Sequence, residues 1–133
     1  MIDLHVPVVT TAAAAVLGLV FAALSIQVVA GRVSSKVDLG SGNDPKHPLS
    51  IAVRCQANFA EYVPLSLLLI GLIELRDGPT LFVKILAAAL VLARLIHPFG
   101  MRMKAPNPFR AGGFIVTVLV LMAASVRALL FLA

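Results

Sequence analysis

An uncharged apolar run near the start of the chain limits what this sequence can fold into. Val6 to Gly31 contain no charged residue, and about 20 apolar residues are enough for a helix to cross the hydrocarbon core of a bilayer. The run is too long for the core of a secretory signal, and the residues before it include Asp3 but no Lys or Arg. Arg32 and Lys36 follow the run. We therefore expect a retained first transmembrane helix whose N-terminus lies outside.

The composition favours a membrane protein over a soluble one. Hydrophobic residues make up 60% of the 133 positions, and the mean hydropathy is +1.02, whereas a soluble domain needs a polar surface. The net charge of +5 does not indicate a nucleic-acid partner, because the basic residues are scattered singly. The single cysteine, Cys55, excludes an internal disulfide and a cysteine-based metal site. His5, His47 and His97 show no ligand spacing, so we expect no metal.

Turn-forming residues divide the chain into four apolar segments within a single domain, residues 1–133. Gly40 to Pro45 form one cluster of turn formers, Gly78-Pro79 a second, and the residues from Pro98 to Pro108 a third. The sequence predicts an all-α integral membrane protein, a bundle of four transmembrane helices. The predicted helices cover approximately residues 6–31, 49–75, 80–97 and 110–132.

One polar stripe interrupts the apolar pattern of the second segment. At about 100° per residue, Arg54, Asn58, Glu61 and Leu65 fall within an arc of about 60° on one helix face. The uncharged stretch from Tyr62 to Ile73 is too short to span a membrane alone, so the stripe must lie within the membrane or at its edge. Because charged side chains are costly in lipid, the stripe is expected to face protein, a water-filled cavity or a ligand.

The positive-inside rule places the first and third connections in the cytoplasm and both termini outside, because these connections carry most of the loop cations. Those cations are Arg32, Lys36, Lys46, Arg102, Lys104 and Arg110. This topology also gathers polar residues from all four helices at one level of the membrane. They are Arg32, Arg54, Asn58, Glu61, Arg94, His97 and Arg110. Four arginines against one glutamate leave about three positive charges uncompensated, which favours an anionic ligand held by arginine–carboxylate pairs.

Other interpretations of the polar layer stay open. Glu61 can pair with Arg54 or Arg94 and fasten the second helix to the third, while Arg32 and Arg110 extend to the lipid headgroups. The chain can instead be a small proton-coupled exporter with Glu61 as the proton carrier, although arginine neighbours favour the charged form of a carboxylate and so oppose proton capture. A third alternative is a non-catalytic protein whose arginine layer binds anionic lipid.

The stretch Arg54-x-x-x-Asn58-x-x-Glu61-Tyr62-x-Pro64-Leu65 resembles the second-helix signature of the MAPEG family, the membrane-associated proteins of eicosanoid and glutathione metabolism. The family includes leukotriene C synthases and microsomal glutathione transferases, and the chain is most similar to bacterial members of about this length. The likeness covers nearly the whole chain. Its other parts are the loop Gly40 to Pro45, Glu74, Ala93 to His97 with Gly100, and Arg110 with Gly112.

The resemblance implies a homotrimer of four-helix subunits in a bacterial inner membrane, with glutathione as co-substrate bound between subunits near the cytoplasmic face. By matching position, the implied glutathione-binding residues are Arg32, Arg54, Gln56, Asn58, Glu61, Tyr62, Arg94 and His97. Arg110 is similar to the arginine that stabilises the glutathione thiolate, which gives it the catalytic role. The implied reaction is a glutathione transferase or peroxidase reaction on a lipophilic electrophile from the bilayer. His97 and Met101 stand where the leukotriene C synthase pattern has tyrosines.

Overall fold

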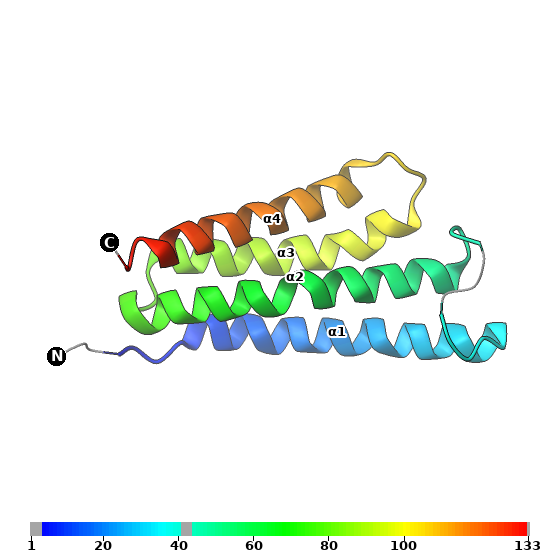
Figure 1. Cartoon of the computed structure of the whole chain (residues 1–133), viewed down its shortest axis with the longest axis horizontal. Coiled ribbons are helices and arrows are strands. Elements are labelled where there is room, and N and C mark those ends of the chain that lie inside the picture. Colours follow the sequence, from blue (N-terminus) through cyan, green and yellow to red (C-terminus); the bar gives the residue numbers. More distant parts are fainter. Residues whose placement is uncertain (1–3, 41–43, 133) are drawn as a thin grey trace.

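The computed structural model describes residues 4–40 and 44–132, and these residues form four helices that run alternately up and down (Figure 1). The helices are α1 (Val8–Ser35), α2 (Pro48–Asp77), α3 (Leu81–Arg102) and α4 (Pro108–Leu129). Each of them is long and apolar enough to cross a membrane. The predicted all-α architecture with four transmembrane helices is therefore confirmed.

α3 runs further than the sequence suggested. It was expected to end near His97 because Pro98 follows, but the helix continues through Pro98 to Arg102. Proline disturbs a helix by removing one donor and crowding the preceding turn. Here the last turn of α3 has a tertiary partner, since the side-chain amide of Asn107 donates to the carbonyl of Gly100 over 2.9 Å. Packing against the start of α4 thus outweighs the local preference to stop.

The core lies between the two central helices, because α2 and α3 each contact all the other helices, while α1 and α4 do not contact one another within the described residues. Residues buried in this core include Leu17, Leu24, Phe59, Val63, Ile70, Val83, Leu90 and Val120. Large apolar side chains also cover the outside of the bundle, and Leu19, Ile26, Leu92 and Leu119 are more than half exposed. Such a surface suits contact with lipid or with another subunit.

The two ends of the bundle differ, and we call them the terminal end and the cationic end. At the terminal end, both termini lie beside the turn between α2 and α3 (Figure 1). At the cationic end, the connection from α1 to α2 lies on the same side as the connection from α3 to α4 (Figure 1).

At the terminal end, the carboxylate of Glu74 caps the first turn of α1. Glu74 is fully buried, and its oxygens accept the N–H groups of Val9 (2.8 Å) and Thr10 (2.7 Å) and the hydroxyl of Thr10 (2.6 Å). The first N–H groups of a helix have no partner inside it, and a negative charge there interacts favourably with the helix dipole. α1 has no capping side chain next to it in sequence, so α2 provides the cap.

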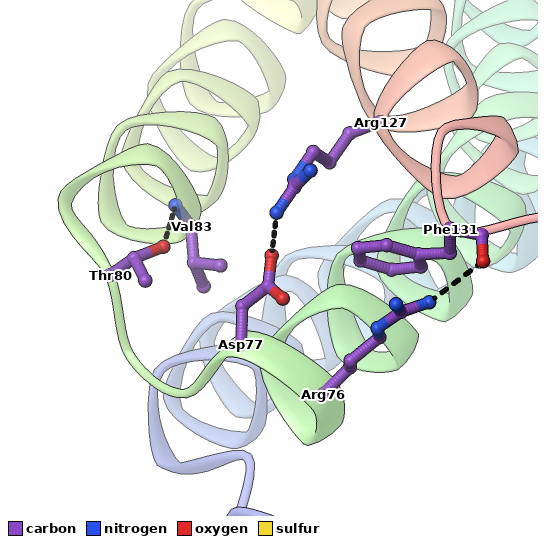
Figure 2. Close-up of polar contacts among 6 residues, drawn as sticks. All are labelled: Arg76, Asp77, Thr80, Val83, Arg127 and Phe131. Atoms are coloured by element: carbon purple, nitrogen blue, oxygen red, sulfur yellow. Dashed lines mark hydrogen bonds and ion pairs between the residues drawn. The ribbon is translucent and has the colours of Figure 1, made fainter. Parts of the chain in front are cut away.

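Other charged residues of the terminal end meet around Phe131, as Figure 2 shows. Nη2 of Arg127 lies 2.5 Å from Oδ2 of Asp77, and Arg76 donates to the carbonyl of Phe131 over 3.0 Å. The guanidinium carbons of Arg76 and Arg127 lie 4.2 Å and 4.8 Å from the centre of the Phe131 ring, within cation–π range. These contacts tie the end of the chain to the end of α2.

Candidate functional site

A cleft of about 450 Å³ opens at the cationic end, between α2, α3 and the start of α4. It is called the inner cleft below. Its walls are formed by Arg54, Asn58, His97, Met101, Ala105, Pro106, Asn107, Arg110, Ala111 and Phe114. Two arginines thus face a cleft that none of the described acidic residues lines, while Met101 and Phe114 give it an apolar part. A cleft of this kind suits a small anion that carries or meets an apolar group.

Behind the cleft, Arg94 joins three helices. It is 1% exposed, and its guanidinium donates to Oδ1 of Asn58 (2.8 Å), the carbonyl of Gly113 (3.0 Å) and Oγ1 of Thr117 (2.5 Å). These acceptors are all neutral, and none of the described carboxylates forms an ion pair with Arg94. Because the carbonyl of Asn58 is engaged by Arg94, its NH₂ group is the part of the amide left to donate to a ligand.

The approach of Arg94 to α4 depends on a glycine. A Cβ atom placed on Gly113 would lie 2.9 Å from Cβ of His97 and 3.0 Å from the carbonyl oxygen of Ala93. Contacts that short would force α3 and α4 apart. Gly113 therefore allows the close crossing at which Arg94 reaches the backbone of α4.

Asn107 and Gly100 position Arg110 through its backbone. Asn107 is the N-cap of α4, and its Oδ1 accepts the N–H of Arg110 over 2.9 Å. A Cβ atom on Gly100 would lie 2.7 Å from Cα of Arg110 and from the carbonyl carbon of Phe109, so α3 and α4 touch here backbone to backbone. The side chain of Arg110 is exposed and makes no hydrogen bond or ion pair with the part of the chain that the structure describes.

The structure brings most of the predicted site residues together. Arg54, Asn58, His97 and Arg110 line the inner cleft, and Arg94 contacts Asn58 from behind. Tyr62 lies one turn along α2 from Asn58 and packs edge-on against the cleft residue Phe114, with 5.7 Å between ring centroids. Topology alone predicted that seven polar residues would converge at one level, and five of them lie together here, namely Arg54, Asn58, Arg94, His97 and Arg110.

Three predicted residues lie elsewhere in the single chain. Gln56 faces α1, where its Nε2 donates to Oγ of Ser25 over 3.0 Å. Arg32 lies in the last turn of α1, and its Nη1 donates to the carbonyl oxygen of Asp38 over 3.4 Å. Glu61 is exposed and does not line the inner cleft. The ion pair of Glu61 with Arg54 or Arg94, one of the alternatives above, is not formed. The one ion pair among the described residues joins Arg127 and Asp77 at the other end of the bundle.

Sequence reasoning missed several residues that shape the cleft. Asn107 had a readable signal, because Asn before Pro108 is a typical start of a helix, with an N-cap followed by proline at the first position. Thr117 and Gly113 carried no such signal. Their importance comes from Arg94, which is far away in sequence and reaches them only once α3 and α4 are packed.

Taken together, the fold and the cleft define a four-helix membrane protein with a cationic, partly apolar cleft at one end of the bundle. The chain belongs to the MAPEG family, whose pattern matches residues 10–130, nearly the whole sequence. The resemblance noted in the second helix is thereby confirmed. No curated protein and no solved structure matches the chain.

Proposed function

We propose that the protein is a glutathione-dependent membrane transferase, acting on lipophilic electrophiles with glutathione as co-substrate. The observation that carries the proposal is the pair Arg54 and Arg110. Both guanidiniums line one cleft, and neither has an acidic partner among the described residues. The MAPEG family to which the chain belongs includes glutathione transferases and related enzymes.

The charges of glutathione suit the groups that the cleft offers. The tripeptide has two carboxylates, one ammonium group and an ionisable thiol. In the proposal, Arg54 pairs with a carboxylate and the NH₂ group of Asn58 donates to a neighbouring oxygen. Glu61, one turn further along α2, is the acidic residue assigned to the ammonium group. Met101 and Phe114 offer an apolar wall to the electrophile.

Arg110 is proposed to be the catalytic residue, since it would contact the reacting sulfur. A thiol attacks as the thiolate, and a cation beside the sulfur lowers the thiol pKa by about a unit or more. The thiol proton passes to solvent, the thiolate electron pair forms the new carbon–sulfur bond, and the leaving group departs with its bonding pair. The protein needs no nucleophile of its own for this reaction, and its single cysteine, Cys55, is buried.

We also propose a homotrimer with the site between subunits and the cationic end in the cytoplasm, in a bacterial inner membrane. This proposal is supported by the positions of the predicted glutathione-binding residues, which lie on two separate faces of the subunit. Arg54 and Arg110 line the inner cleft, whereas Gln56 contacts α1 and Arg32 lies in the last turn of that helix. One glutathione molecule could contact both sets only if a second copy placed its α1 side over the cleft. The excess of cations at this end supports the orientation.

Glutathione binding to the purified protein tests the proposal directly. We expect isothermal titration in a neutral detergent to show saturable binding, and ultraviolet absorbance to show thiolate formation. Arg54→Leu should weaken binding by about 10-fold or more, because a charge-assisted hydrogen bond contributes about 1.5–3 kcal/mol. Lys84→Leu is the matched control, since it removes an exposed cation from the other end of the bundle. Absence of glutathione binding by the native protein would refute the proposal.

A further inference from the structure

A second and larger cleft adjoins the inner cleft at the cationic end. Its volume is about 930 Å³, and it shares Arg54, Met101, Ala105 and Arg110 with the inner cleft. It is called the outer cleft below. Its charged lining consists of Lys46, Arg54, Arg102, Lys104 and Arg110. All five are cations, and none of the described Asp or Glu residues belongs to the lining.

Three of these cations lie outside the proposed glutathione site, and the described part of the chain leaves their charge uncompensated. Neither the Lys46 nor the Lys104 ammonium group forms an ion pair there. Arg102 donates to Oε1 of Gln27, which is a neutral acceptor. The nearest acid in sequence, Asp44, uses Oδ1 to accept the backbone N–H of Lys46 over 2.8 Å and pairs with no described cation.

The outer cleft also lies at a definite depth. Ser50 is in the first turn of α2, Arg102 is the last residue of α3, and Arg110 is in the first turn of α4. The ends of membrane-spanning helices lie near the boundary between hydrocarbon and headgroups, about 15 Å from the bilayer centre. A basic pocket between transmembrane helices at that depth is a typical binding site for phosphate-bearing headgroups.

We propose that the outer cleft binds a phosphate group through Lys46, Arg102 and Lys104. Two sources carry this chemistry at that depth, the headgroup of an acidic phospholipid and a soluble phosphate ester. Phosphate suits the lining because arginine pairs with it through two hydrogen bonds and lysine acts as a mobile point charge. Ile51, Met101 and Met103 add an apolar part to the lining, which an acyl chain or other apolar substituent can cover. This site goes beyond the proposed transferase activity and does not require it.

Ligand titration of the detergent-purified protein tests the site, with the thermal unfolding midpoint as the readout. The probes are short-chain phosphatidylglycerol, short-chain phosphatidylcholine and glycerol 3-phosphate. We expect at least one of the two net anionic probes to raise the midpoint at concentrations where phosphatidylcholine does not. The double variant Lys46→Gln/Lys104→Gln should weaken that response by about 30-fold, because each of the two cations near a phosphate contributes a factor of about five.

The matched control is Lys36→Gln/Lys84→Gln, which removes the same charge from exposed positions outside the cleft. A response to phosphatidylglycerol alone identifies a lipid headgroup as the source, and a response to glycerol 3-phosphate identifies a soluble ester. Equal weakening in both double variants, or no preference over phosphatidylcholine, overturns the proposal. Glutathione titration of the same variants keeps the two proposals separate. If the native protein binds no glutathione while its lipid response depends on Lys46 and Lys104, only the transferase proposal fails.

Discussion

The two ends of this bundle use charge in different ways. At the terminal end, Glu74 accepts three hydrogen bonds, Asp77 pairs with Arg127, and Arg76 donates to a carbonyl. At the cationic end, the side chains of Arg54 and Arg110 have no acidic partner among the described residues. The first set of charges is satisfied within the fold, whereas the second set is exposed to whatever enters the clefts.

This difference separates structural charges from candidate binding charges in a membrane protein. A charged group near lipid is costly unless it is paired or solvated, so an unpaired cation that lines a cleft indicates a ligand more strongly than a paired one does. Arg94 stands between the two cases. It is buried like Glu74, but its acceptors are neutral, and one of them, Asn58, belongs to the inner cleft.

The largest effect is expected for Arg110→Ala. Its exposed side chain makes no hydrogen bond or ion pair with the described residues, so the unfolding temperature should change little. Conjugation of glutathione to a dinitrophenyl halide should fall about 10²–10³-fold, which is typical for loss of one group that stabilises developing charge. Steady-state kinetics and thermal unfolding of the same preparation measure the two quantities.

Arg127→Ala is the opposite control for Arg110→Ala. It removes an arginine that pairs with Asp77 at the terminal end, so we expect a lower unfolding temperature and unchanged turnover at temperatures where the variant is folded. The comparison between the ends fails if both variants lose stability and activity in the same proportion.

Arg94→Leu should have the second largest effect, on stability and binding together. It leaves acceptor groups of Asn58 and Thr117 without their donor, at a cost of about 1–3 kcal/mol for each buried group. It also frees the Asn58 amide to turn, so the dissociation constant for glutathione should rise. Urea unfolding and calorimetry report the two effects.

Thr117→Val provides the matched control for that variant. It removes one acceptor of Arg94 and leaves the bond between Arg94 and Asn58 (2.8 Å) in place. We expect a loss of about 1 kcal/mol in stability and no change in glutathione affinity. An unchanged affinity in folded Arg94→Leu would show that Arg94 does not orient Asn58.

Glu74→Gln should lower the free energy of unfolding by about 2 kcal/mol. The amide keeps one acceptor oxygen but places an NH₂ group beside the N–H groups of α1, and it removes the charge that favours the helix N-terminus. Glu61→Gln is the matched change on the same helix. Because Glu61 is exposed and has no ion-pair partner among the described residues, its stability effect should stay within about 0.5 kcal/mol. Thermal unfolding compares the two, and a larger effect at Glu61 would contradict this assignment of roles.

Much of the fold follows from the sequence, because the four apolar segments are long and the turn formers between them are distinct. The same pattern fixes the approximate depth of a residue in the membrane. This is why Arg54, His97 and Arg110 were expected at one level, and they do line one cleft. Depth depends only on position along a helix and on the alternating direction of the helices.

The contacts of each helix face depend on packing, which the sequence specifies less directly. Gln56 is two positions from Arg54, about 200° away on a helix, and it faces Ser25 of α1 instead of the inner cleft. The role of Glu74 was not predicted at all. Its partners are more than sixty residues away, and no local pattern links a carboxylate at the end of α2 to the start of α1.

The smallest effect is expected for the ion pair between Asp77 and Arg127, and its size tests how much ion pairing contributes to stability at the terminal end. The two side chains are 20% and 40% exposed, and ion pairs that solvent can reach contribute about 0.2–1 kcal/mol. A double-mutant cycle with Asp77→Asn and Arg127→Leu should give a coupling energy in that range, reduced by added salt. Arg127 also lies against the Phe131 ring, so the single Arg127→Leu variant should cost more than the coupling energy alone. A coupling energy near zero would mean that this end is held by the Glu74 cap and by packing on Phe131. In that case the two ends would differ only in having or lacking a buried, hydrogen-bonded charge, and Glu74 would be the one example of such a charge at the terminal end.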